Sequence, residues 1–302
     1  MLASKPIKIG TYHIPALLNE TVEALNIRPR KKYIDATLGG GGHSEEIVKR
    51  GGILLGIDQD PEAVSYASER LACPGLTPPM FAKGNFANIS RLARENNFEK
   101  VDGILFDLGV SSHQLETSYR GFSFNQEGSL DMRMDPNLSV TAKDLVNGLN
   151  EGELSKLFLK LGEEKFAKRY ARAICGARAG RQIETGDELA KIIMEHAPPG
   201  RKYGHIHPAT KVFQALRIAV NDELNSLKEA LPQTLELLNP GGRLVVISFH
   251  SLEDGIVKRF FLENQQKNVL KIINQKPVVP TEKEIKLNPR ARSAKLRGAE
   301  KL

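Results

Sequence analysis

The fold is decided by the stretch Asp35-Ala36-Thr37-Leu38-Gly39-Gly40-Gly41-Gly42-His43, which lies between a predicted strand (33–37) and a predicted helix that opens at Ser44. Glycines in such a turn let a ligand approach the backbone, and the N–H groups of the following helix point toward it. Asp58 stands 19 residues after Gly39, at the end of the next predicted strand (53–57). An acidic residue at this spacing can accept hydrogen bonds from both ribose hydroxyls of an adenosine. The pattern predicts a Rossmann-like fold with an adenosine-containing cofactor; a tight turn that binds nothing is the alternative.

The residues after the turn discriminate between adenosine cofactors. A dinucleotide fingerprint G-x-G-x-x-G would need glycine at position 44, which is Ser44. Glu45 and Glu46 occupy the first helical turn, where a pyrophosphate needs an uncompensated positive dipole. S-adenosyl-L-methionine carries a sulfonium and an ammonium but no phosphate, so these carboxylates favour it over NAD. We predict S-adenosyl-L-methionine as the cofactor, and a nicotinamide-dependent oxidoreductase is the rival.

The chain alternates strands and helices at both ends but not in the middle. Predicted strands at 33–37, 53–57, 80–83 and 104–106 are typical of βαβ units, and a fifth follows at 244–247. Between them the patterns are helical, with capping-box signatures at Asn150 and Thr185. We therefore predict a discontinuous methyltransferase core, residues 1–110 and 208–302, interrupted by an all-helical insertion, residues 111–207.

Local signals also predict several boundaries. Asp60-Pro61 should begin a helix, with Asp as N-cap and Pro at the first helical position. Pro232 should interrupt the long helix that follows residue 208, and Asn239-Pro240-Gly241-Gly242 should form a turn. Several prolines make the segment after residue 276 an irregular tail, with a late strand near 295–297.

Composition excludes several classes of protein. The 302 residues include 43 Lys and Arg against 36 Asp and Glu, a formal net charge of +7, which favours a polyanionic partner. Cys73 and Cys175 lie far apart without a CxxC pair, so we predict neither a disulfide framework nor a metal site. The sequence shows no apolar run long enough to span a bilayer and no signal peptide. We expect a soluble cytoplasmic protein.

Two segments at predicted strand ends carry candidate catalytic residues. Asp107 ends the fourth strand; its carboxylate could hold an N–H of an exocyclic amine and favour the pyramidal nitrogen of the transition state, or it could contact the cofactor. The sequence leaves both roles open. The segment 248–254 follows the fifth strand, where Phe249 or His250 could stack on a flipped base. A Ser-His-Asp hydrolase is disfavoured because no G-x-S-x-G elbow is present.

A set of longer motifs extends along nearly the whole chain. In order, they are His13-Ile14-Pro15-Ala16-Leu17-Leu18-Asn19-Glu20, residues 35–44, Asp107-Leu108-Gly109-Val110-Ser111-Ser112-His113-Gln114, Arg120-Gly121-Phe122-Ser123-Phe124, Leu130-Asp131-Met132-Arg133-Met134-Asp135, residues 213–221, residues 248–254, and Asn288-Pro289-Arg290-Ala291-Arg292-Ser293. Together they resemble the bacterial 16S ribosomal RNA cytosine-N4 methyltransferase family (RsmH/MraW). One departure is His113, where many members carry proline.

The resemblance implies N4-methylation of a decoding-centre cytosine, position 1402 in conventional numbering, with 16S rRNA in the small ribosomal subunit as partner. It implies cofactor-binding roles for one set of residues: Gly41, Gly42, His43, Asp58, Phe86, Asp107 and Gln114. It leaves Asp107 and, more weakly, His250 as the catalytic candidates. A homodimer stays open, and no membrane partner is expected.

The resemblance also implies that the helical insertion recognises the substrate. A basic cluster within it agrees with this role, although a solvated helix face is the alternative: Lys165, Lys168, Arg169, Arg172, Arg178 and Arg181. A non-catalytic RNA-binding assembly factor would explain the same basic residues without using Asp107, and is the second rival to a methyltransferase.

Overall fold

The computed structural model describes residues 15–72, 77–124, 128–202 and 207–302. They belong to two compact units, one formed by residues 1–113 and 225–302 and the other by residues 114–224. The predictions that concern His13, Ile14 and Cys73 lie outside the described residues. In the described parts of the chain, no helix combines the length and apolar character needed to cross a membrane.

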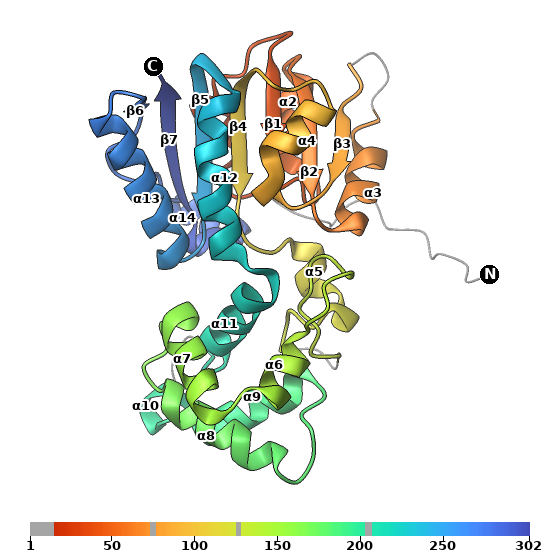
Figure 1. The fold of residues 1–302 in the computed structure, drawn as a ribbon, viewed down its shortest axis with the longest axis vertical. Coiled ribbons are helices and arrows are strands. Elements are labelled where there is room, and N and C mark those ends of the chain that lie inside the picture. Colours follow the sequence, from red (N-terminus) through yellow and green to blue (C-terminus); the bar gives the residue numbers. More distant parts are fainter. Residues whose placement is uncertain (1–14, 73–76, 125–127, 203–206) are drawn as a thin grey trace, which may run out of the picture. The chain divides into compact units, whose positions relative to one another are not determined.

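The first unit is built on a seven-stranded mixed sheet with the order β3-β2-β1-β4-β5-β7-β6 (Figure 1). The strands are β1 (Lys32–Asp35), β2 (Ile53–Asp58), β3 (Met80–Lys83), β4 (Val101–Asp107), β5 (Leu238–Ser248), β6 (Leu270–Ile272) and β7 (Lys295–Lys301). Strands β1 to β5 are parallel, whereas β7 runs antiparallel to both of its neighbours. The predicted Rossmann-like class is confirmed. The antiparallel β7 departs from the 3-2-1-4-5-6 order of parallel dinucleotide-binding sheets.

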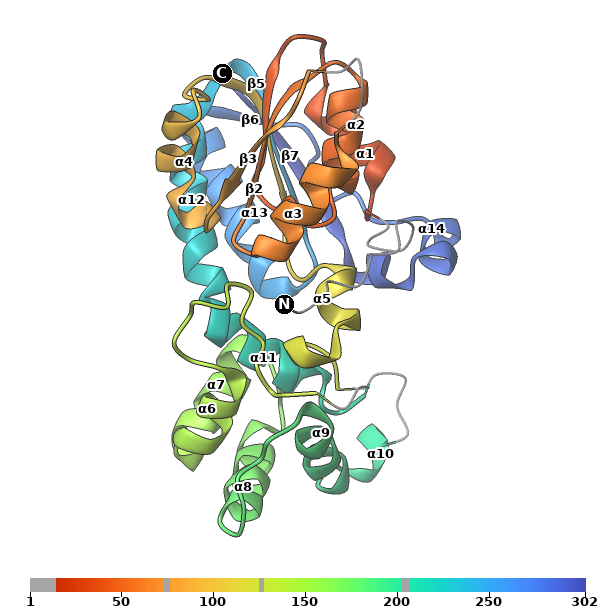
Figure 2. The same cartoon turned by 90° about the vertical axis from the view of Figure 1, so that its right-hand side faces the viewer.

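Helices cover both faces of this sheet; Figure 2 shows α1 and α2 on one face and α4 and α12 on the other. The helices are α1 (Leu18–Leu25), α2 (Gly42–Lys49), α3 (Pro61–Arg70), α4 (Ile89–Glu95), α12 (Glu223–Leu237), α13 (Ser251–Gln266) and α14 (Glu282–Leu287). The predicted start of α3 is confirmed, because the Asp60 carboxylate accepts a hydrogen bond from the Glu62 N–H and Pro61 is the first helical residue.

The core between α1, α2 and the sheet is tightly packed around Tyr33, which is 1% exposed. Its hydroxyl accepts a hydrogen bond from the Arg28 N–H at 2.8 Å, so the buried polar atom is satisfied. A Cβ at Gly103 would lie 2.8 Å from the Tyr33 ring, and one at Gly52 would lie 2.8 Å from Ile47 Cγ2. These glycines therefore allow the strands and α2 to close around the ring.

The second unit is helical. Its helices are α6 (Ala142–Gly148), α7 (Glu151–Gly162), α8 (Ala167–Arg178), α9 (Gly186–Glu195), α10 (Pro199–Lys202) and α11 (Thr210–Asn221), and α5 (Ser112–Glu116) crosses the boundary from the first unit. A full capping box at Asn150 begins α7, as predicted. At Thr185 only half of the predicted box forms: Thr185 accepts from the Glu188 N–H, but the Glu188 carboxylate accepts from the Glu184 N–H instead.

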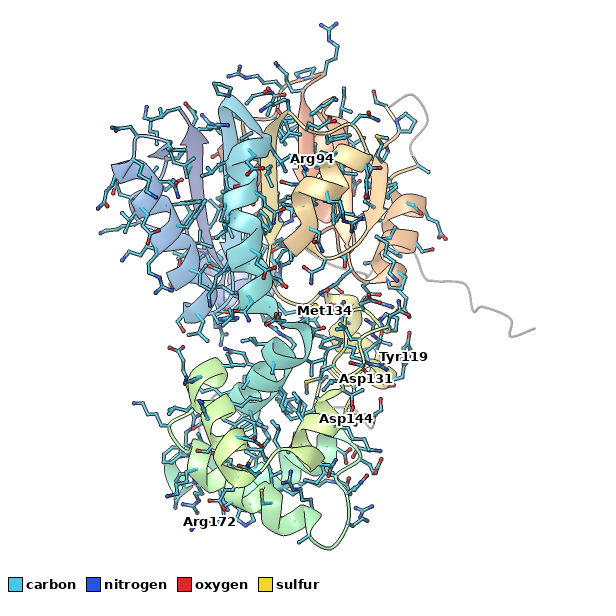
Figure 3. The ribbon with its side chains drawn as sticks, viewed as in Figure 1. Arg94, Tyr119, Asp131, Met134, Asp144 and Arg172 are labelled. Atoms are coloured by element: carbon cyan, nitrogen blue, oxygen red, sulfur yellow. The ribbon has the colours of Figure 1, made fainter. Side chains whose placement is uncertain are left out.

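A loop that leads into α6 is held to α11 by one asparagine. Asn221 donates from Nδ2 to the Met132 carbonyl at 2.8 Å and accepts at Oδ1 from the Met134 N–H at 2.7 Å. Figure 3 labels Asp131 and Met134 in this loop and Asp144 on α6. Arg120 donates to the Met134 carbonyl at 3.0 Å. Three motifs of the sequence therefore meet here to build the helical unit.

The break in the long predicted helix does not fall at Pro232. The chain bends at Asp222, which adopts a left-handed conformation (φ 48°) between α11 and α12, while Pro232 lies inside α12. The first unit takes up the chain at Asn225, so α11 belongs to the helical unit, whereas the sequence predicts the boundary at residue 208.

Two predictions for the last third of the chain are wrong in detail. Residues 239–242 fall within the bounds of β5, where Gly241 has φ 77° and the pairing with β4 shifts its register between Val101 and Gly103. The tail is more ordered than predicted, because α14 forms within it and the late strand extends over 295–301.

Candidate active site

Three acidic side chains end three neighbouring strands of the first unit. Asp58 is the last residue of β2, Asp35 of β1 and Asp107 of β4, and the sheet order places these strands side by side. Because the strands are parallel, their carboxyl ends share one edge of the sheet, where ligands of doubly wound folds bind. The predicted residues Asp58 and Asp107 therefore belong to one site, and Asp35 joins them. We call these three carboxylates the acidic edge.

Asp58 is joined to the glycine turn directly. Its Oδ2 accepts a hydrogen bond from the Gly39 N–H at 2.8 Å, and its Oδ1 accepts from the Asp60 N–H at 2.9 Å. Burial raises the pKa of the Asp58 carboxyl to about 6, although these two N–H groups favour the ionised form. The residue keeps some exposed surface, so the remaining lone pairs of its carboxylate are available to a ligand with two hydroxyl donors.

The glycines of the turn are required for different structural reasons. Gly39 (φ 47°) and Gly41 (φ 74°) both adopt left-handed backbone conformations. A Cβ at Gly41 would lie 3.3 Å from Ala67 Cβ on α3, and one at Gly42 would lie 3.0 Å from Pro15. At Gly39 the nearest atom would be 3.8 Å away. Packing thus accounts for the absence of side chains at Gly41 and Gly42, while the open space lies at Gly39.

His43 is buried (5% exposed) and connects two ends of the site. Its Nε2 lies 3.1 Å from the Ala16 carbonyl oxygen, and its Nδ1 lies 3.4 Å from Asp107 Oδ2. Both neighbours are hydrogen-bond acceptors, which favours the doubly protonated, positively charged form of the imidazole. Burial lowers the pKa of His43, but the Asp107 and Asp35 carboxyls outweigh this effect, and the pKa is raised above its usual value.

Asp35 and Asp107 are fixed by their own partners. Ser44 Oγ donates to Asp35 Oδ2 at 2.7 Å, and the Thr37 N–H donates to Asp35 Oδ1 at 3.2 Å. Burial raises the pKa of Asp35 despite these hydrogen bonds. Thr37 Oγ1 accepts a hydrogen bond from the Asp107 N–H at 2.6 Å, which ties the end of β4 to the glycine turn. The acidic edge is therefore rigid.

Phe86 and Gln114, the other predicted cofactor-binding residues, lie outside the acidic edge. Phe86 lies in a short 3₁₀ helix after β3, where its ring packs edge-on against Phe106 with centroids 5.5 Å apart. Gln114 is the first residue of the second unit, and its predicted cofactor contact stays a prediction. The departure from the family pattern, His113, places its Nε2 3.2 Å from a carboxylate oxygen of Glu62 on α3.

The segment 248–254 has clear structural tasks. His250 is the N-cap of α13, and its Nδ1 accepts a hydrogen bond from the Glu253 N–H, while the Glu253 carboxylate accepts from the His250 N–H. Asp254 pairs with Arg297 on β7 at 2.6 Å. These contacts favour a structural role for the motif, and the catalytic role of His250 stays a prediction.

Sequence reasoning does not identify three members of the site. It assigns Asp35 and Thr37 to a strand and Ser44 to a helix start, yet together they connect β1, β4 and α2 by hydrogen bonds. A signal for them is present in the sequence, since polar residues that end buried parallel strands meet at a shared sheet edge.

A Rossmann-like core with acidic groups at the ends of β1, β2 and β4, and without a dinucleotide fingerprint, defines the methyltransferase class. Residues 10–302 match the model of the MraW methylase family, and the chain belongs to that family. Membership confirms the predicted methyltransferase activity and S-adenosyl-L-methionine as the cofactor. The resemblance seen in the motifs is thereby confirmed.

The relatives cover the chain almost completely. Ribosomal RNA small subunit methyltransferase H of Carboxydothermus hydrogenoformans is 49% identical over 96% of this chain and 98% of its own length. The protein of the same description from Heliobacterium modesticaldum is 46% identical over 96% and 99%. Among solved structures, an rRNA methylase from Streptococcus thermophilus has a TM-score of 0.44 at 12% identity, covering 94% of this chain and 93% of that one. The family assignment rests on the sequence matches.

Proposed function

We propose that this protein methylates N4 of a decoding-centre cytosine in 16S rRNA within the small ribosomal subunit, in the cytoplasm. The substrate class follows from the relatives, whose description names the small ribosomal subunit RNA. The single observation that carries the chemistry is the acidic edge, where Asp58, Asp35 and Asp107 end adjacent parallel strands.

The donor set at this edge fits the cofactor. S-adenosyl-L-methionine supplies a methyl group on a positively charged sulfur. Asp58 would accept hydrogen bonds from the two ribose hydroxyls, and Gly39 gives the nucleoside room to approach the backbone. Glu45, in the first turn of α2, is ionised and paired with Arg70 at 2.6 Å, so a carboxylate stands where a dinucleotide would need to place its pyrophosphate.

Asp107 would orient the target amine. Its backbone is held by Thr37, and its Oδ2 faces the charged His43 ring. The carboxylate would accept an N–H of the cytosine amine and direct the nitrogen lone pair toward the methyl group, so that proximity and orientation supply much of the acceleration. A cofactor contact by Asp107 is the alternative, and the two roles differ in whether turnover or cofactor affinity depends on it.

We also propose that the helical unit recognises the RNA around the target. This unit is contiguous in sequence and carries the basic helix α8, whereas the first unit carries the acidic edge. The separation of charges suits one small cationic ligand and one large anionic one.

The experiment is methyl transfer from radiolabelled S-adenosyl-L-methionine to isolated small subunits, with naked 16S rRNA in parallel. The proposal expects one methyl group per subunit, located on a cytosine N4 by mass spectrometry of the digested RNA. Label on another base or another atom contradicts the proposed substrate. Binding of subunits without any transfer favours the assembly-factor rival.

A further inference from the structure

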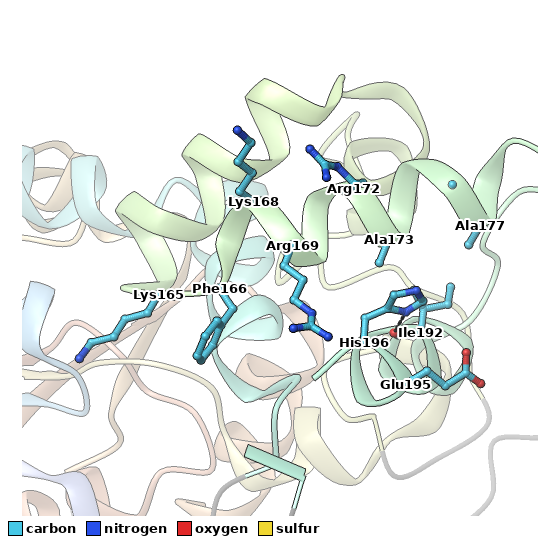
Figure 4. Close-up of a pocket in the computed structure, with 11 residues that line it drawn as sticks. Lys165, Phe166, Lys168, Arg169, Arg172, Ala173, Ala177, Ile192, Glu195 and His196 are labelled. Atoms are coloured by element: carbon cyan, nitrogen blue, oxygen red, sulfur yellow. Dashed lines mark hydrogen bonds between the residues drawn. The ribbon is translucent and has the colours of Figure 1, made fainter. Parts of the chain in front are cut away.

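A cavity of about 730 Å³ lies on the helical unit between α8 and α9 (Figure 4). We name it the α8 cavity, and these residues line it: Lys165, Phe166, Lys168, Arg169, Arg172, Ala173, Gly176, Ala177, Ile192, Glu195 and His196. All of them belong to one compact unit. A cavity of this volume is large enough for a nucleotide.

Four exposed cations border the α8 cavity. Lys168, Arg169 and Arg172 belong to α8 and Lys165 lies two residues before it, and Figure 4 shows the four side chains extending in different directions around this segment. Among the described residues, no carboxylate lies within ion-pair distance of the first three. Arg172 reaches Glu151 only at 3.6 Å, with its own side chain 72% exposed.

Other members of the predicted basic cluster are used differently. Arg178 donates to the Val146 and Leu149 carbonyls, and Arg181 pairs with Glu188. These two side chains therefore hold the helical unit together. The cluster seen in the sequence divides into a structural part and a part that faces the α8 cavity.

Small side chains and hydrogen-bond acceptors line the rest of the α8 cavity. Ala173, Gly176 and Ala177 are small, and a Cβ at Gly176 would meet no atom within 4 Å, so a ligand can approach the helix closely. His196 Nδ1 donates to the Ile192 carbonyl at 2.9 Å, which leaves Nε2 for a ligand. With the Glu195 carboxylate, this wall offers acceptors to hydroxyl donors, and the opposite wall offers cations to phosphates.

We propose that the α8 cavity binds the sugar–phosphate backbone of RNA, with Arg169 and Arg172 on phosphates and the Glu195–His196 wall on 2′-hydroxyls. The inference rests on the proposed function, since it names how the helical unit holds its substrate. Cations bind phosphates and acceptors bind 2′-hydroxyls, so together they recognise the RNA backbone and do not distinguish between bases. This site is therefore a general RNA anchor that is separate in role from the acidic edge.

The test measures binding of a fluorescent RNA hairpin to the full chain over a range of salt concentrations. The double variant Arg169→Ala, Arg172→Ala should reduce the magnitude of the slope of log K against log salt by about 1.4 to 1.8. The reason is that RNA binding to the variant forms two fewer phosphate contacts and therefore releases fewer counterions. Its affinity for the hairpin should fall about 10- to 100-fold at fixed salt. A DNA hairpin of the same sequence should bind the wild-type chain more weakly than the RNA.

A matched control is the double variant Lys156→Ala, Lys160→Ala, which removes the same charge from positions on α7 that do not line the cavity. It should retain the wild-type slope within about 0.5. Hydrogen exchange in α7, α8 and α9 should be the same for all three proteins, which shows that the helical unit is folded in each.

Three results would overturn the cavity assignment: equal slopes for the two double variants, equal affinity for RNA and DNA hairpins, or complete competition by polyglutamate, which would point to an acidic protein partner. The proposed function fails separately, if the wild-type chain transfers no methyl group to subunits. If the wild-type chain methylates subunits but the Arg169→Ala, Arg172→Ala variant has the wild-type salt slope for RNA binding, only the proposal for the α8 cavity is overturned.

Discussion

The acidic edge of the first unit and the α8 cavity of the second are built on opposite principles. At the acidic edge, short side chains are buried or half-buried and are fixed by backbone or hydroxyl partners, as Asp58 is by Gly39 and Asp60. At the α8 cavity, long side chains are exposed, and three of the four cations have no carboxylate within ion-pair distance among the described residues. A small ligand with a reacting atom needs the first arrangement, because orientation decides its rate. A long polyanion needs only the second, because charge density decides its affinity.

The largest expected effect concerns the acidic edge, whose side chains are held in fixed positions. Asp107→Ala should reduce methyl transfer to small subunits at saturating cofactor by about 10²- to 10⁴-fold, because the positioned acceptor for the amine is lost. Transfer of labelled methyl groups measures this. Asp102→Ala, which removes a carboxylate near the opposite end of the same strand β4, is the control and should retain nearly full turnover. Unchanged turnover in the Asp107 variant would reject the amine contact.

The second effect concerns the cofactor. Asp58→Ala should weaken S-adenosyl-L-methionine binding about 10²- to 10⁴-fold, because two hydrogen bonds to a charged acceptor are lost at about 1.5–3 kcal/mol each. Calorimetry measures the affinity, and Glu69→Ala, which removes a carboxylate on α3, serves as the control. An affinity within threefold of wild type would place the ribose elsewhere.

The third prediction asks whether the two regions depend on separate units. Asn221→Ala should destabilise the helical unit by about 3 kcal/mol, because the Met132 carbonyl and the Met134 N–H both lose a buried partner. Hydrogen exchange should report faster opening of α6 and α11, while cofactor affinity in the first unit stays within twofold. Asn137→Ala, an exposed position in the same unit, is the control. A parallel loss of cofactor binding would show that the units are coupled.

A fourth prediction follows from the buried environment of Asp58. Its carboxyl pKa is raised to about 6 by burial, with Asp60 and Asp35 adding repulsion. Ribose hydroxyls donate to the ionised form, so the cofactor should bind with full affinity above pH 6 and lose about tenfold per unit as the pH falls below it. Calorimetry between pH 5 and pH 8, in buffers of different ionisation enthalpy, should also detect proton release near pH 6. A flat profile in that range contradicts the assignment of Asp58 as the ribose acceptor.

The smallest effect concerns the departure from the family pattern. His113→Pro should change stability by less than about 1 kcal/mol, because the contact with Glu62 is partly exposed and proline is tolerated in a first helical turn. Thermal unfolding measures the stability. A loss of several kcal/mol would assign His113 a structural role that its surroundings do not suggest.

Local chemistry makes much of the fold predictable from sequence. The Asp60-Pro61 start of α3 and the capping box at Asn150 form as expected, because each depends only on residues up to three positions apart. The position of the helix break is not predictable, because it does not depend on a strong local signal. Pro232 is a strong local signal that α12 accommodates, whereas the left-handed Asp222 has no comparable signal.

The site is predictable in its positions but not in its connections. The spacing from Gly39 to Asp58 and the strand end at Asp107 are enough, as sequence patterns, to put two acidic groups at one sheet edge. The contact between His43 and the Ala16 carbonyl joins residues 27 positions apart, and no local pattern encodes it. The charge state of His43 follows only from that pairing and from its contact with Asp107.

The antiparallel strand β7 has a consequence for how the chain reaches its native state. Residues 295–301 pair with both β5 and β6, and Lys301 Nζ donates to the Leu238 carbonyl at 2.7 Å. During synthesis, the sheet that carries the acidic edge cannot close until these residues have left the ribosome. Residues 114–224, by contrast, form an uninterrupted segment that can fold first. In a nascent chain, the helices of the second unit would then be ready before the seven-stranded sheet is complete.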